Sequence, residues 1–451
     1  MLVERWRARG GEVAVVGLGR SGLAATHLLR DRGLAVYASD GGRGERLEAQ
    51  AAELRARGAA VDVGGHDLAR IRAATAVVCS PGVPPDAAPR AAAALAGREV
   101  VGELDLGIAE LPRTRAVAIT GTNGKTTTTT IVAHVLRGLG LDAEAAGNIG
   151  LPVCEVARRA APPAWLALEV SSFQLHDAPH LDPAIGVLTN LAPNHLDRYP
   201  TLASYYADKA LLFRHARPGS TWVTNADNAD VVAMVREVAG RHRRFSTEGR
   251  AEGWYDRAGR RLMLGDVPVM PRDEFPLLGD HNVANALAAV LVGAELGGAP
   301  AAIAAALRTV TPIAHRVEPI REAGGVLWIN DSKSTNVTST VVAIASLERP
   351  FVLLLGGRHK GEPYTRLGPL LAPRCRAVVA YGEAGPLVEA DLAGQVPVVR
   401  AGDFAEVLAT ARGLARPGDA VLLSPACSSY DMFDNYEQRG EAFRAAVAAL
   451  P

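Results

Sequence analysis

Short apolar runs that end in glycine, serine or aspartate alternate with amphipathic stretches along the whole chain. This alternation predicts buried parallel strands joined by helices, the pattern of an α/β protein. In the first hundred residues it predicts helices over 23–32 and 45–57. The strands that it predicts along the chain cover residues 13–16, 35–39, 76–79, 116–120, 165–170, 185–189, 326–330, 351–355, 377–381 and 420–423.

These elements fall into three groups, which indicates three domains. The chain has 451 residues, and domains commonly have about 150. We expect the first domain to span residues 1–104, the second 105–312 and the third 313–451. Each would hold a mainly parallel sheet flanked by helices.

Composition restricts the possible partners. Lys plus Arg and Asp plus Glu both number 48, so the net charge is zero and no general excess of positive charge is available for a nucleic-acid backbone. No apolar run approaches the length of about 18 residues that a membrane helix requires, and we expect no secretory leader. These observations predict a cytoplasmic protein that binds neither nucleic acid nor membrane.

The four cysteines, at positions 79, 154, 375 and 427, lie far apart and form no CxxC pair. This spacing disfavours both a disulfide framework and a zinc site. We expect buried free thiols.

A glycine-rich turn directly follows the first predicted strand. It reads Gly17-Leu-Gly19-Arg-Ser21-Gly22 and leads into a helix, which is the context of a GxGxxG nucleotide-binding loop. Such glycines let the backbone approach a diphosphate at the positive end of the helix. Asp40 ends the second strand and could accept a hydrogen bond from a ribose hydroxyl. On this domain alone, a nicotinamide cofactor, another nucleotide diphosphate and a ligand-free turn all stay open.

A second phosphate-binding loop follows the strand predicted over 116–120. Residues 121–127 read GTNGKTT, and the loop departs from the strict GxxxxGK[ST] spacing because Ile119 stands five positions before Gly124. Its chemistry is the same: backbone N–H groups cradle phosphate oxygens, Lys125 neutralises phosphate charge, and the Thr126 hydroxyl can ligate Mg²⁺. The loop predicts ATP or GTP. Two such loops on one chain favour transfer or ligation over hydride chemistry.

Polar residues stand at the ends of two further strands, where α/β domains place their sites. Glu169 ends an apolar run, and a carboxylate buried there needs a cation or a donor, with Mg²⁺ the obvious partner. The alternative is a glutamate exposed at the strand end. His195 and Asp197 follow the strand over 185–189 and could be a metal ligand and a brace for the loop, or His195 could be purely structural.

Lys209 lies on the apolar stripe of a predicted helix. That helix begins with Thr201 as its N-cap, and Lys209 stands seven positions after Leu202. If the side chain points inward, desolvation lowers the pKa of its amine, which could then capture CO₂ as a carbamate and give a second Mg²⁺ an anionic ligand. The alternative is a lysine that extends its ammonium group into water.

Taken together, these motifs resemble a known family. They look like those of the ATP-dependent Mur ligases, which add amino acids to the peptidoglycan precursor, and the resemblance covers the whole chain. The segments that carry it are GTNGKTTTT at 121–129, GNIG at 147–150, EVSSFQL at 169–175, NHLDRY at 194–199, HNVAN at 281–285, HR at 315–316 and NDSK at 330–333. Within the family, SPGV at 80–83, SSFQL at 171–175 and SPACSSYDMF at 424–433 are similar to the branch that adds D-glutamate to UDP-N-acetylmuramoyl-L-alanine.

The resemblance implies a domain plan and a reaction. A Rossmann-like N-terminal domain would bind the UDP-sugar, a P-loop central domain would bind ATP, and a Rossmann-like C-terminal domain would bind the amino acid. The carboxylate of the UDP-linked substrate would attack the γ-phosphate of ATP to give an acyl phosphate and ADP, and the amine of D-glutamate would then displace phosphate. Two Mg²⁺ ions, a carbamylated lysine and a monomeric chain are further expectations.

The resemblance also assigns site residues. The catalytic residues would be Lys125, Glu169, His195 and Lys209. The ATP phosphates would contact Gly121, Thr122, Asn123, Gly124, Lys125, Thr126 and Thr127, and the adenosine would contact Asn285, Arg316 and Asp331. One Mg²⁺ would bind Thr126 and Glu169, and the other His195 and carbamylated Lys209. The UDP-linked substrate would contact Gly19, Ser21, Asp40, Ser80, Pro81, Gly82, Asn148 and Gln174. D-Glutamate would contact Thr335, Lys360, Ser429, Tyr430 and Tyr436.

Three other interpretations stay open at this point. A nicotinamide-dependent oxidoreductase would explain the first glycine-rich turn but leaves residues 121–127 and Lys209 without a role. A nucleotide-binding regulator without activity would keep the second loop but would not need Glu169 and His195. The third is a Mur-type ligase with a different acceptor amino acid.

Overall fold

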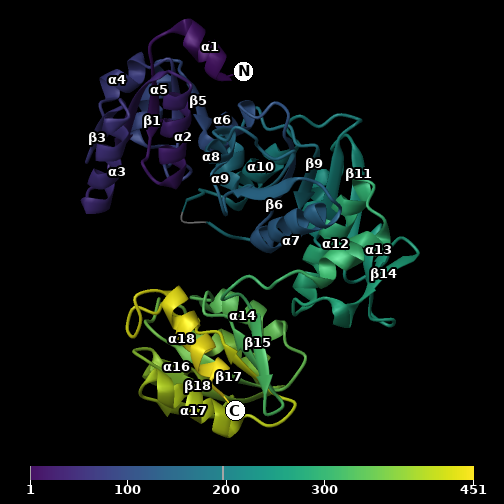
Figure 1. Cartoon of the computed structure of the whole chain (residues 1–451). Helices are drawn as coiled ribbons and strands as arrows, with labels where there is room; N and C mark the ends of the chain where they lie inside the picture. Colours follow the sequence, from purple (N-terminus) through teal and green to yellow (C-terminus); the bar gives the residue numbers. More distant parts are fainter. Residues whose placement is uncertain (1, 196–197, 451) are drawn as a thin grey trace. The chain divides into compact units, whose positions relative to one another are not determined.

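Three sheets organise the chain (Figure 1). The structure is a computed structural model that describes residues 2–195 and 198–450. The chain divides into two compact units, Met1–Arg272 with Ala284–Arg308, and Asp273–Val283 with Thr309–Pro451. The first unit holds two sheets and the second holds one. Within the described ranges, no helix combines the length and the apolar character needed to span a membrane.

The first sheet is parallel throughout and has the order β3-β2-β1-β4-β5. Its strands are β1 Glu12–Val16, β2 Ala35–Asp40, β3 Ala60–Val63, β4 Ala76–Cys79 and β5 Glu99–Gly102. The helices of this region are α1 Leu2–Arg9, α2 Arg20–Asp31, α3 Glu45–Ala56, α4 Leu68–Ala73, α5 Ala88–Leu95 and α6 Glu103–Ala109. The chain order reverses between β1 and β4, so the loops that follow these two strands meet at a topological switch point.

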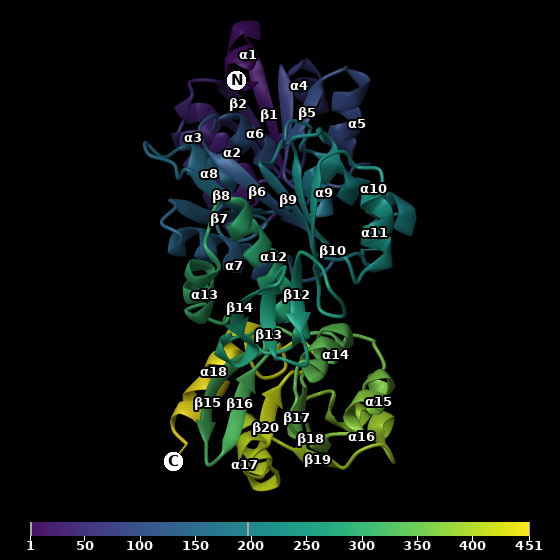
Figure 2. The same ribbon diagram turned by 90° about the vertical axis from the view of Figure 1, so that its right-hand side faces the viewer.

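The second sheet has nine strands in the order β14-β13-β12-β11-β10-β9-β6-β8-β7. It is parallel from β7 to β12, and β13 and β14 add an antiparallel edge. Its strands are β6 Arg115–Thr120, β7 Ala143–Gly147, β8 Trp165–Glu169, β9 Ile185–Leu188, β10 Thr221–Asn225, β11 Arg241–Ser246, β12 Gly253–Asp256, β13 Arg261–Leu264 and β14 Val267–Pro271. The helices are α7 Lys125–Gly138, α8 Val153–Ala157, α9 Ser172–His176, α10 Leu202–Ala210, α11 Ala229–Val235, α12 Asp280–Glu295 and α13 Pro300–Arg308, with short 3₁₀ turns η1 Leu211–Phe213 and η2 Arg272–Glu274. Helices α7 and α13 pack side by side (Figures 1 and 2).

The third sheet has six strands in the order β15-β16-β20-β17-β18-β19, which Figure 2 shows side by side. Its strands are β15 Glu318–Ala323, β16 Val326–Asn330, β17 Phe351–Gly356, β18 Cys375–Tyr381, β19 Val398–Ala401 and β20 Ala420–Leu423. The helices are α14 Val337–Ala345, α15 Gly368–Leu371, α16 Gly385–Leu392, α17 Phe404–Leu414 and α18 Tyr436–Ala448, with the 3₁₀ turn η3 Tyr364–Leu367. Leu353 and Leu355 of β17 belong to one buried apolar cluster, whereas Val352 and Leu354 belong to another. Successive side chains of a strand point to opposite faces, so both faces of this sheet are covered.

The predicted elements are confirmed with small shifts at their ends. The strands over 76–79, 326–330 and 420–423 have the predicted bounds, and the other predicted strands differ by one or two residues. The helix predicted over 23–32 begins earlier, at Arg20, because Gly19 is its N-cap. All four cysteines are free thiols; three are buried and Cys375 is half-buried. The domain boundaries at 104/105 and 312/313 stay predictions.

A buried ion pair ties the first sheet's domain to the second. Arg90 of α5 donates to both carboxylate oxygens of Asp177, at 2.9 and 2.5 Å, and the two side chains are only 10% and 7% exposed. The carbonyl oxygen of Asp177 also accepts from the backbone N–H of Gly102 at 2.7 Å. Asp177 follows α9 directly, so this contact fixes the end of that helix against β5.

Removing one partner of this pair should destabilise the protein strongly, because the other charge would stay buried without compensation. We expect Asp177→Ala to lower the free energy of unfolding by about 3–5 kcal/mol, measured by urea denaturation. The exposed pair Arg217–Asp182, with side chains 59% and 41% exposed, provides the control. Asp182→Ala should cost at most about 1 kcal/mol, and equal losses for the two variants would contradict the assignment.

Candidate active site

The second phosphate-binding loop joins β6 to α7 in a conformation that requires glycine. Gly121 has φ 149°, and a Cβ there would lie 2.0 Å from the hydroxyl oxygen of Thr189. Gly124 has φ 78° at the start of α7, and its Cβ would lie 2.6 Å from Oδ1 of Asn285. The side of the loop that faces Thr189 and Asn285 is therefore closely packed. The backbone N–H groups of the loop lie at the positive end of a 14-residue helix.

Asn190, which the sequence analysis did not identify, holds this loop in place. Its side-chain oxygen accepts from the N–H of Asn123 at 2.9 Å, and its carbonyl oxygen accepts from the N–H of Thr122 at 2.9 Å. The contact joins the ends of β6 and β9, which are neighbours in the sheet. Its sequence signal was only a polar residue directly after the predicted strand over 185–189.

The side chain of Lys125 curls back over the loop that precedes it. Its Nζ donates to the carbonyl oxygens of Gly121, at 3.1 Å, and Thr122, at 2.8 Å. Thr126 and Thr127 follow in the first turn of α7 and are half-buried. A cation, backbone donors and a hydroxyl are thus gathered at one helix end, the donor set that a phosphate group with a bound Mg²⁺ requires.

Lys209 is directed inward, and the alternative of an ammonium group extended into water is wrong. The residue is 1% exposed on α10, whose N-cap is Thr201 as predicted. Its Nζ donates to the carbonyl oxygen of Gly121 at 2.7 Å and lies 4.9 Å from the ring centroid of Tyr205. Burial, followed by the nearby positive charge of Lys125, lowers the pKa of the Lys209 amine to about 7.

Glu169 is also buried, so the alternative of an exposed glutamate at the strand end is wrong. It is 2% exposed at the end of β8, and its Oε1 accepts from the side-chain amide of Asn148 at 2.7 Å. The other oxygen, Oε2, is buried without a hydrogen-bond partner among the described residues. A buried carboxylate oxygen without a donor fits a site for a cation.

His195 lies on the loop after β9, next to the aromatic residues of α9 and α10. It is an exposed residue with φ 55°, and its ring lies edge-on to Phe173, at 5.3 Å between centroids, and to Tyr205, at 5.9 Å. Asp197, the predicted brace of this loop, lies outside the described residues. Among the residues that are described, no group of three His, Cys, Asp or Glu side chains could hold a metal ion by itself.

The first glycine-rich turn meets the loop after β4 at the switch point of the first sheet. Gly17 has φ 89°, its carbonyl oxygen accepts from the Ser80 hydroxyl at 2.9 Å, and a Cβ on Gly22 would lie 1.7 Å from that carbonyl oxygen. A Cβ on Gly19, in contrast, would meet nothing within 4 Å. The packing of the protein explains Gly17 and Gly22, whereas Gly19 leaves open space above the backbone. Ser21 and Pro81 are half-buried, and Gly82, which follows Pro81, is exposed.

Two other residues assigned to the UDP-linked substrate have structural duties. Asp40 accepts from the N–H of Leu18 at 2.7 Å and of Gly42 at 2.8 Å, so its carboxylate shapes the glycine-rich turn. Gln174 is 4% exposed and its side-chain oxygen accepts from the N–H of Ser171 at 3.0 Å in the capping box of α9. Asn148 is exposed and lies beside Glu169, as described above.

The three residues assigned to adenosine are divided between the compact units. Asn285 belongs to the first unit, is 5% exposed, and accepts from the Thr128 hydroxyl at 2.9 Å. Arg316 and Asp331 belong to the second unit. Arg316 is exposed, whereas Asp331 is buried, accepts from the Ser424 hydroxyl at 2.7 Å, and has its pKa raised to about 6 by burial.

The residues assigned to D-glutamate all lie in the second unit, around the loops that follow its strands. Lys360 donates to the Thr335 hydroxyl at 3.3 Å, which brings two of them together. Ser429 is 2% exposed, whereas Tyr430 is 63% exposed, and Tyr436 begins α18.

Arg439 braces these loops and was missed by the sequence analysis. It is fully buried on α18 and donates to the hydroxyl and carbonyl oxygens of Ser332, at 2.9 and 2.8 Å, and to the carbonyl oxygen of Cys427, at 3.2 Å. No spacing rule marks a single arginine in a polar helix as buried.

Known proteins resemble the whole chain. Three family models match: the MurD-like N-terminal domain of Mur ligases over residues 11–102, the Mur ligase middle domain over 119–293, and the glutamate ligase domain of Mur ligases over 315–427. Curated proteins named UDP-N-acetylmuramoylalanine–D-glutamate ligase from Acidobacterium capsulatum and Pelotomaculum thermopropionicum are each 38% identical to it. The first alignment covers 98% of this chain and 97% of the relative, and the second covers 97% and 98%.

Solved structures share the fold. The UDP-N-acetylmuramate–alanine ligase MurC of Thermotoga maritima superimposes with a TM-score of 0.59 at 18% identity, covering 97% of this chain and 99% of that one. A pseudomurein peptide ligase from Methanothermus fervidus gives a TM-score of 0.54, also at 18% identity, over 91% of this chain and 96% of that one. The relatives of higher identity are ligases, which favours a ligase over the oxidoreductase and regulator alternatives. With family models matching each of its three sheet regions and relatives aligned from end to end, this chain belongs to the Mur ligase family.

Proposed function

We propose that this protein joins D-glutamate to UDP-N-acetylmuramoyl-L-alanine, using ATP, in the synthesis of the peptidoglycan precursor. The observation that carries the proposal is the convergence of Lys125, Lys209 and Glu169 around the phosphate-binding loop, in a chain that matches the D-glutamate ligases along nearly its whole length. We further propose that the protein acts in the cytoplasm as a monomer.

The chemistry follows from the poor reactivity of a carboxylate. An oxygen of the alanyl carboxylate attacks the γ-phosphorus of ATP, the bond to the β-phosphate oxygen breaks, and an acyl phosphate and ADP result. The amine of D-glutamate then attacks the acyl carbon, and the tetrahedral intermediate expels phosphate as the amide forms and the nitrogen loses a proton. Phosphoryl transfer of this kind depends on positioning and on compensation of negative charge more than on a protein nucleophile.

The phosphate-binding loop supplies that compensation. Backbone N–H groups of residues 121–127 and the ammonium group of Lys125 would hold the ATP phosphates. Mg²⁺ bound at this site would neutralise charge on the transferring phosphoryl group. Thr126 and Glu169 would hold one ion, and the unpartnered Oε2 of Glu169 fits that role.

Lys209 would serve the second Mg²⁺, together with His195, as a carbamate. A buried amine with a pKa of about 7 is about half neutral near pH 7, so unprotonated amine is available to react. The nitrogen lone pair attacks the carbon of CO₂, an N–C bond forms as one C–O π bond breaks and leaves its electron pair on oxygen, and the nitrogen loses a proton to solvent. The product carries a negative charge next to Lys125, which changes a like-charge contact into an attractive one.

The remaining contacts are proposed from the family motifs. Adenosine would contact Asn285, Arg316 and Asp331. The UDP-linked substrate would lie over the open backbone at Gly19, near Ser80 and Asp40, and would reach Asn148 and Gln174. The two carboxylates of D-glutamate would be recognised by the Lys360 ammonium group and by the hydroxyls of Thr335, Ser429, Tyr430 and Tyr436, since a cation with several hydroxyls suits a dicarboxylate.

Phosphate release should require ATP, UDP-N-acetylmuramoyl-L-alanine and D-glutamate together. A panel of amino-acid acceptors, assayed with the UDP-linked substrate held constant, measures this directly. We expect D-glutamate alone to support turnover. Equal release with L-glutamate, with another amino acid or with no acceptor would contradict the proposal.

Replacing the Lys209 amine should remove turnover without unfolding the protein. We expect Lys209→Met, which keeps the buried chain and loses the amine, to lower kcat by about a hundredfold or more. Added formate or acetate should restore part of it by taking the place of the carbamate. Lys209→Arg is the matched variant that keeps a positive charge but cannot form the carbamate. It should be as inactive as Lys209→Met, because a positive charge alone does not replace the reactive amine. Activity close to wild type in either variant would show that no carbamate is needed.

The pKa of Lys209 sets the pH dependence of carbamate formation. Because burial holds this pKa at about 7, below its ordinary value of 10.5, the folded protein loses the proton while an exposed lysine would still keep it. The neutral fraction of the amine should therefore increase from about pH 6 to about pH 8. At a fixed concentration of dissolved CO₂, we expect protein stripped of CO₂ to recover activity faster as the pH rises across that range, measured after return to one assay pH. Recovery at an unchanging rate would argue against this role of Lys209.

A further inference from the structure

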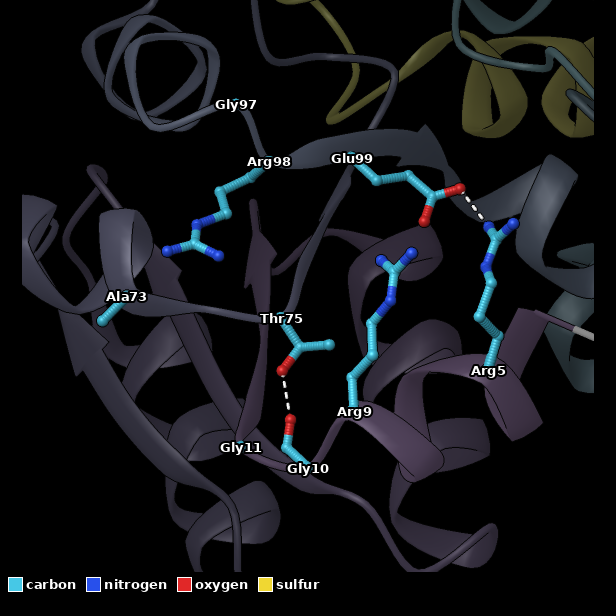
Figure 3. Close-up of a pocket in the computed structure, with 9 residues that line it drawn as sticks. All are labelled: Arg5, Arg9, Gly10, Gly11, Ala73, Thr75, Gly97, Arg98 and Glu99. Carbon is cyan, nitrogen blue, oxygen red and sulfur yellow. Dashed lines mark hydrogen bonds and ion pairs between the residues drawn. The ribbon is translucent and has the colours of Figure 1, made fainter.

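A hollow on the first domain lies away from the site described above (Figure 3). Its volume is about 760 Å³, and its lining residues are Arg5, Arg9, Gly10, Gly11, Ala73, Thr75, Gly97, Arg98 and Glu99. Gly11, Thr75 and Arg98 directly precede β1, β4 and β5. The hollow is therefore at the amino-terminal end of the parallel strands, whereas the glycine-rich turn is at their carboxyl end.

Positive charge exceeds negative charge in this hollow. Three arginines line it and only one acid, Glu99. Both oxygens of that acid are already occupied, because Oε1 pairs with Arg5 and Oε2 accepts from the indole N–H of Trp6 at 2.9 Å. The lining thus carries two guanidinium groups beyond those that Glu99 can compensate.

Arg9 and Arg98 are the two available cations. Arg98 donates through Nε to the carbonyl oxygen of Arg72 at 2.7 Å, which fixes its side chain and leaves its two terminal amino groups for a ligand. The Arg9 side chain makes no hydrogen bond or ion pair within the described parts of the chain. Figure 3 shows the two guanidinium groups on opposite sides of the hollow, extending from α1 and from the turn before β5.

Three glycines, Gly10, Gly11 and Gly97, contribute to the lining of the hollow. A Cβ on Gly10 or Gly97 would meet nothing within 4 Å, so these glycines leave open space. The Thr75 hydroxyl donates to the carbonyl oxygen of Gly10 and holds the turn before β1. No lining side chain is aromatic, and the only aliphatic one is Ala73. The lining therefore offers no aromatic ring for stacking and no apolar pocket for a peptide anchor, so recognition here depends on charge and hydrogen bonds.

We propose that this hollow binds a small anion that carries a diphosphate group. A guanidinium group offers two parallel N–H donors that match two oxygens of one phosphate, so Arg9 and Arg98 would each take one phosphoryl group. A flexible acidic peptide would need apolar anchors that the lining does not offer. The anion could be free pyrophosphate or the diphosphate of a nucleotide, and its site is separate from both glycine-rich loops.

Isothermal titration calorimetry with pyrophosphate and with UDP tests the proposal. The protein carries Lys125→Ala, so that binding at the phosphate-binding loop is weakened and ligase activity is not needed. We expect Arg9→Gln/Arg98→Gln in that background to weaken pyrophosphate binding about tenfold or more. Arg7→Gln/Arg46→Gln removes two exposed arginines outside the hollow and should change the affinity less than about twofold.

A second variant tests the site without removing any contact. Ala73→Glu places a carboxylate among the guanidinium groups and should also weaken pyrophosphate binding about tenfold or more. Thermal denaturation and, with Lys125 restored, phosphate release should stay at wild-type values in all three sets of variants. If Arg9→Gln/Arg98→Gln weakens the binding of pyrophosphate but not of UDP, the ligand is the free anion; equal weakening for both would assign a nucleotide diphosphate, and UDP binding that the double variant leaves unchanged belongs to the glycine-rich turn. Absence of binding, or an equal loss in Arg7→Gln/Arg46→Gln, would overturn the proposal.

Discussion

The carbonyl oxygen of Gly121 accepts hydrogen bonds from two lysines, Lys125 at 3.1 Å and Lys209 at 2.7 Å, and the chemistry of the site depends on this contact. Two ammonium groups that share one acceptor repel each other, and the burial of Lys209 removes the water that would screen them. The protein lowers this repulsion by favouring the neutral amine at Lys209. An anion that enters the site would lower the repulsion between the two lysines further. The site therefore favours the binding of phosphates or the formation of a carbamate.

Sheet topology makes the contact possible. Strands β8, β6 and β9 are neighbours and run parallel, so their carboxyl ends deliver Glu169, the phosphate-binding loop and Asn190 to one edge. Gly121 can pass close to Thr189 only because it has no side chain. Helix α10 then contributes Lys209, whose side chain points inward and donates to the carbonyl oxygen of Gly121. A bulkier residue at position 121 would push the loop away from β9 and separate the carbonyl oxygen from Lys209.

The sequence predicts the strands well because a strand of a parallel sheet is buried on both faces and is therefore an unbroken apolar run, as Phe351–Gly356 illustrates. Helical spacing also places Lys209 on the apolar stripe of its helix, although it leaves open whether the amine points inward or into water. Contacts between distant segments could not be predicted in this way. Arg439 reaches Ser332 across 107 positions, and the duty of Asp40 in shaping the turn before α2 depends on two backbone N–H groups that no pattern reveals. The burial of Glu169 was open between two alternatives because strand ends are buried or exposed according to the loops around them.

Lysine and arginine have different uses in this chain. Lysine occupies only four of the 48 positions that carry Lys or Arg, namely 125, 209, 333 and 360. Arginine can replace lysine wherever a fixed charge on the surface is sufficient, and its guanidinium group keeps its proton in proteins. The carbamate proposed at Lys209 needs an amine that can lose its proton, which an arginine at this position would not supply. The Lys125 ammonium group curls back over its own loop to reach two carbonyl oxygens, a position that suits a compact ammonium group better than a larger planar guanidinium group. The hollow lined by Arg9 and Arg98 shows the opposite case, since recognition of a phosphate by paired N–H donors needs a permanent charge of fixed shape and gains nothing from a group that titrates.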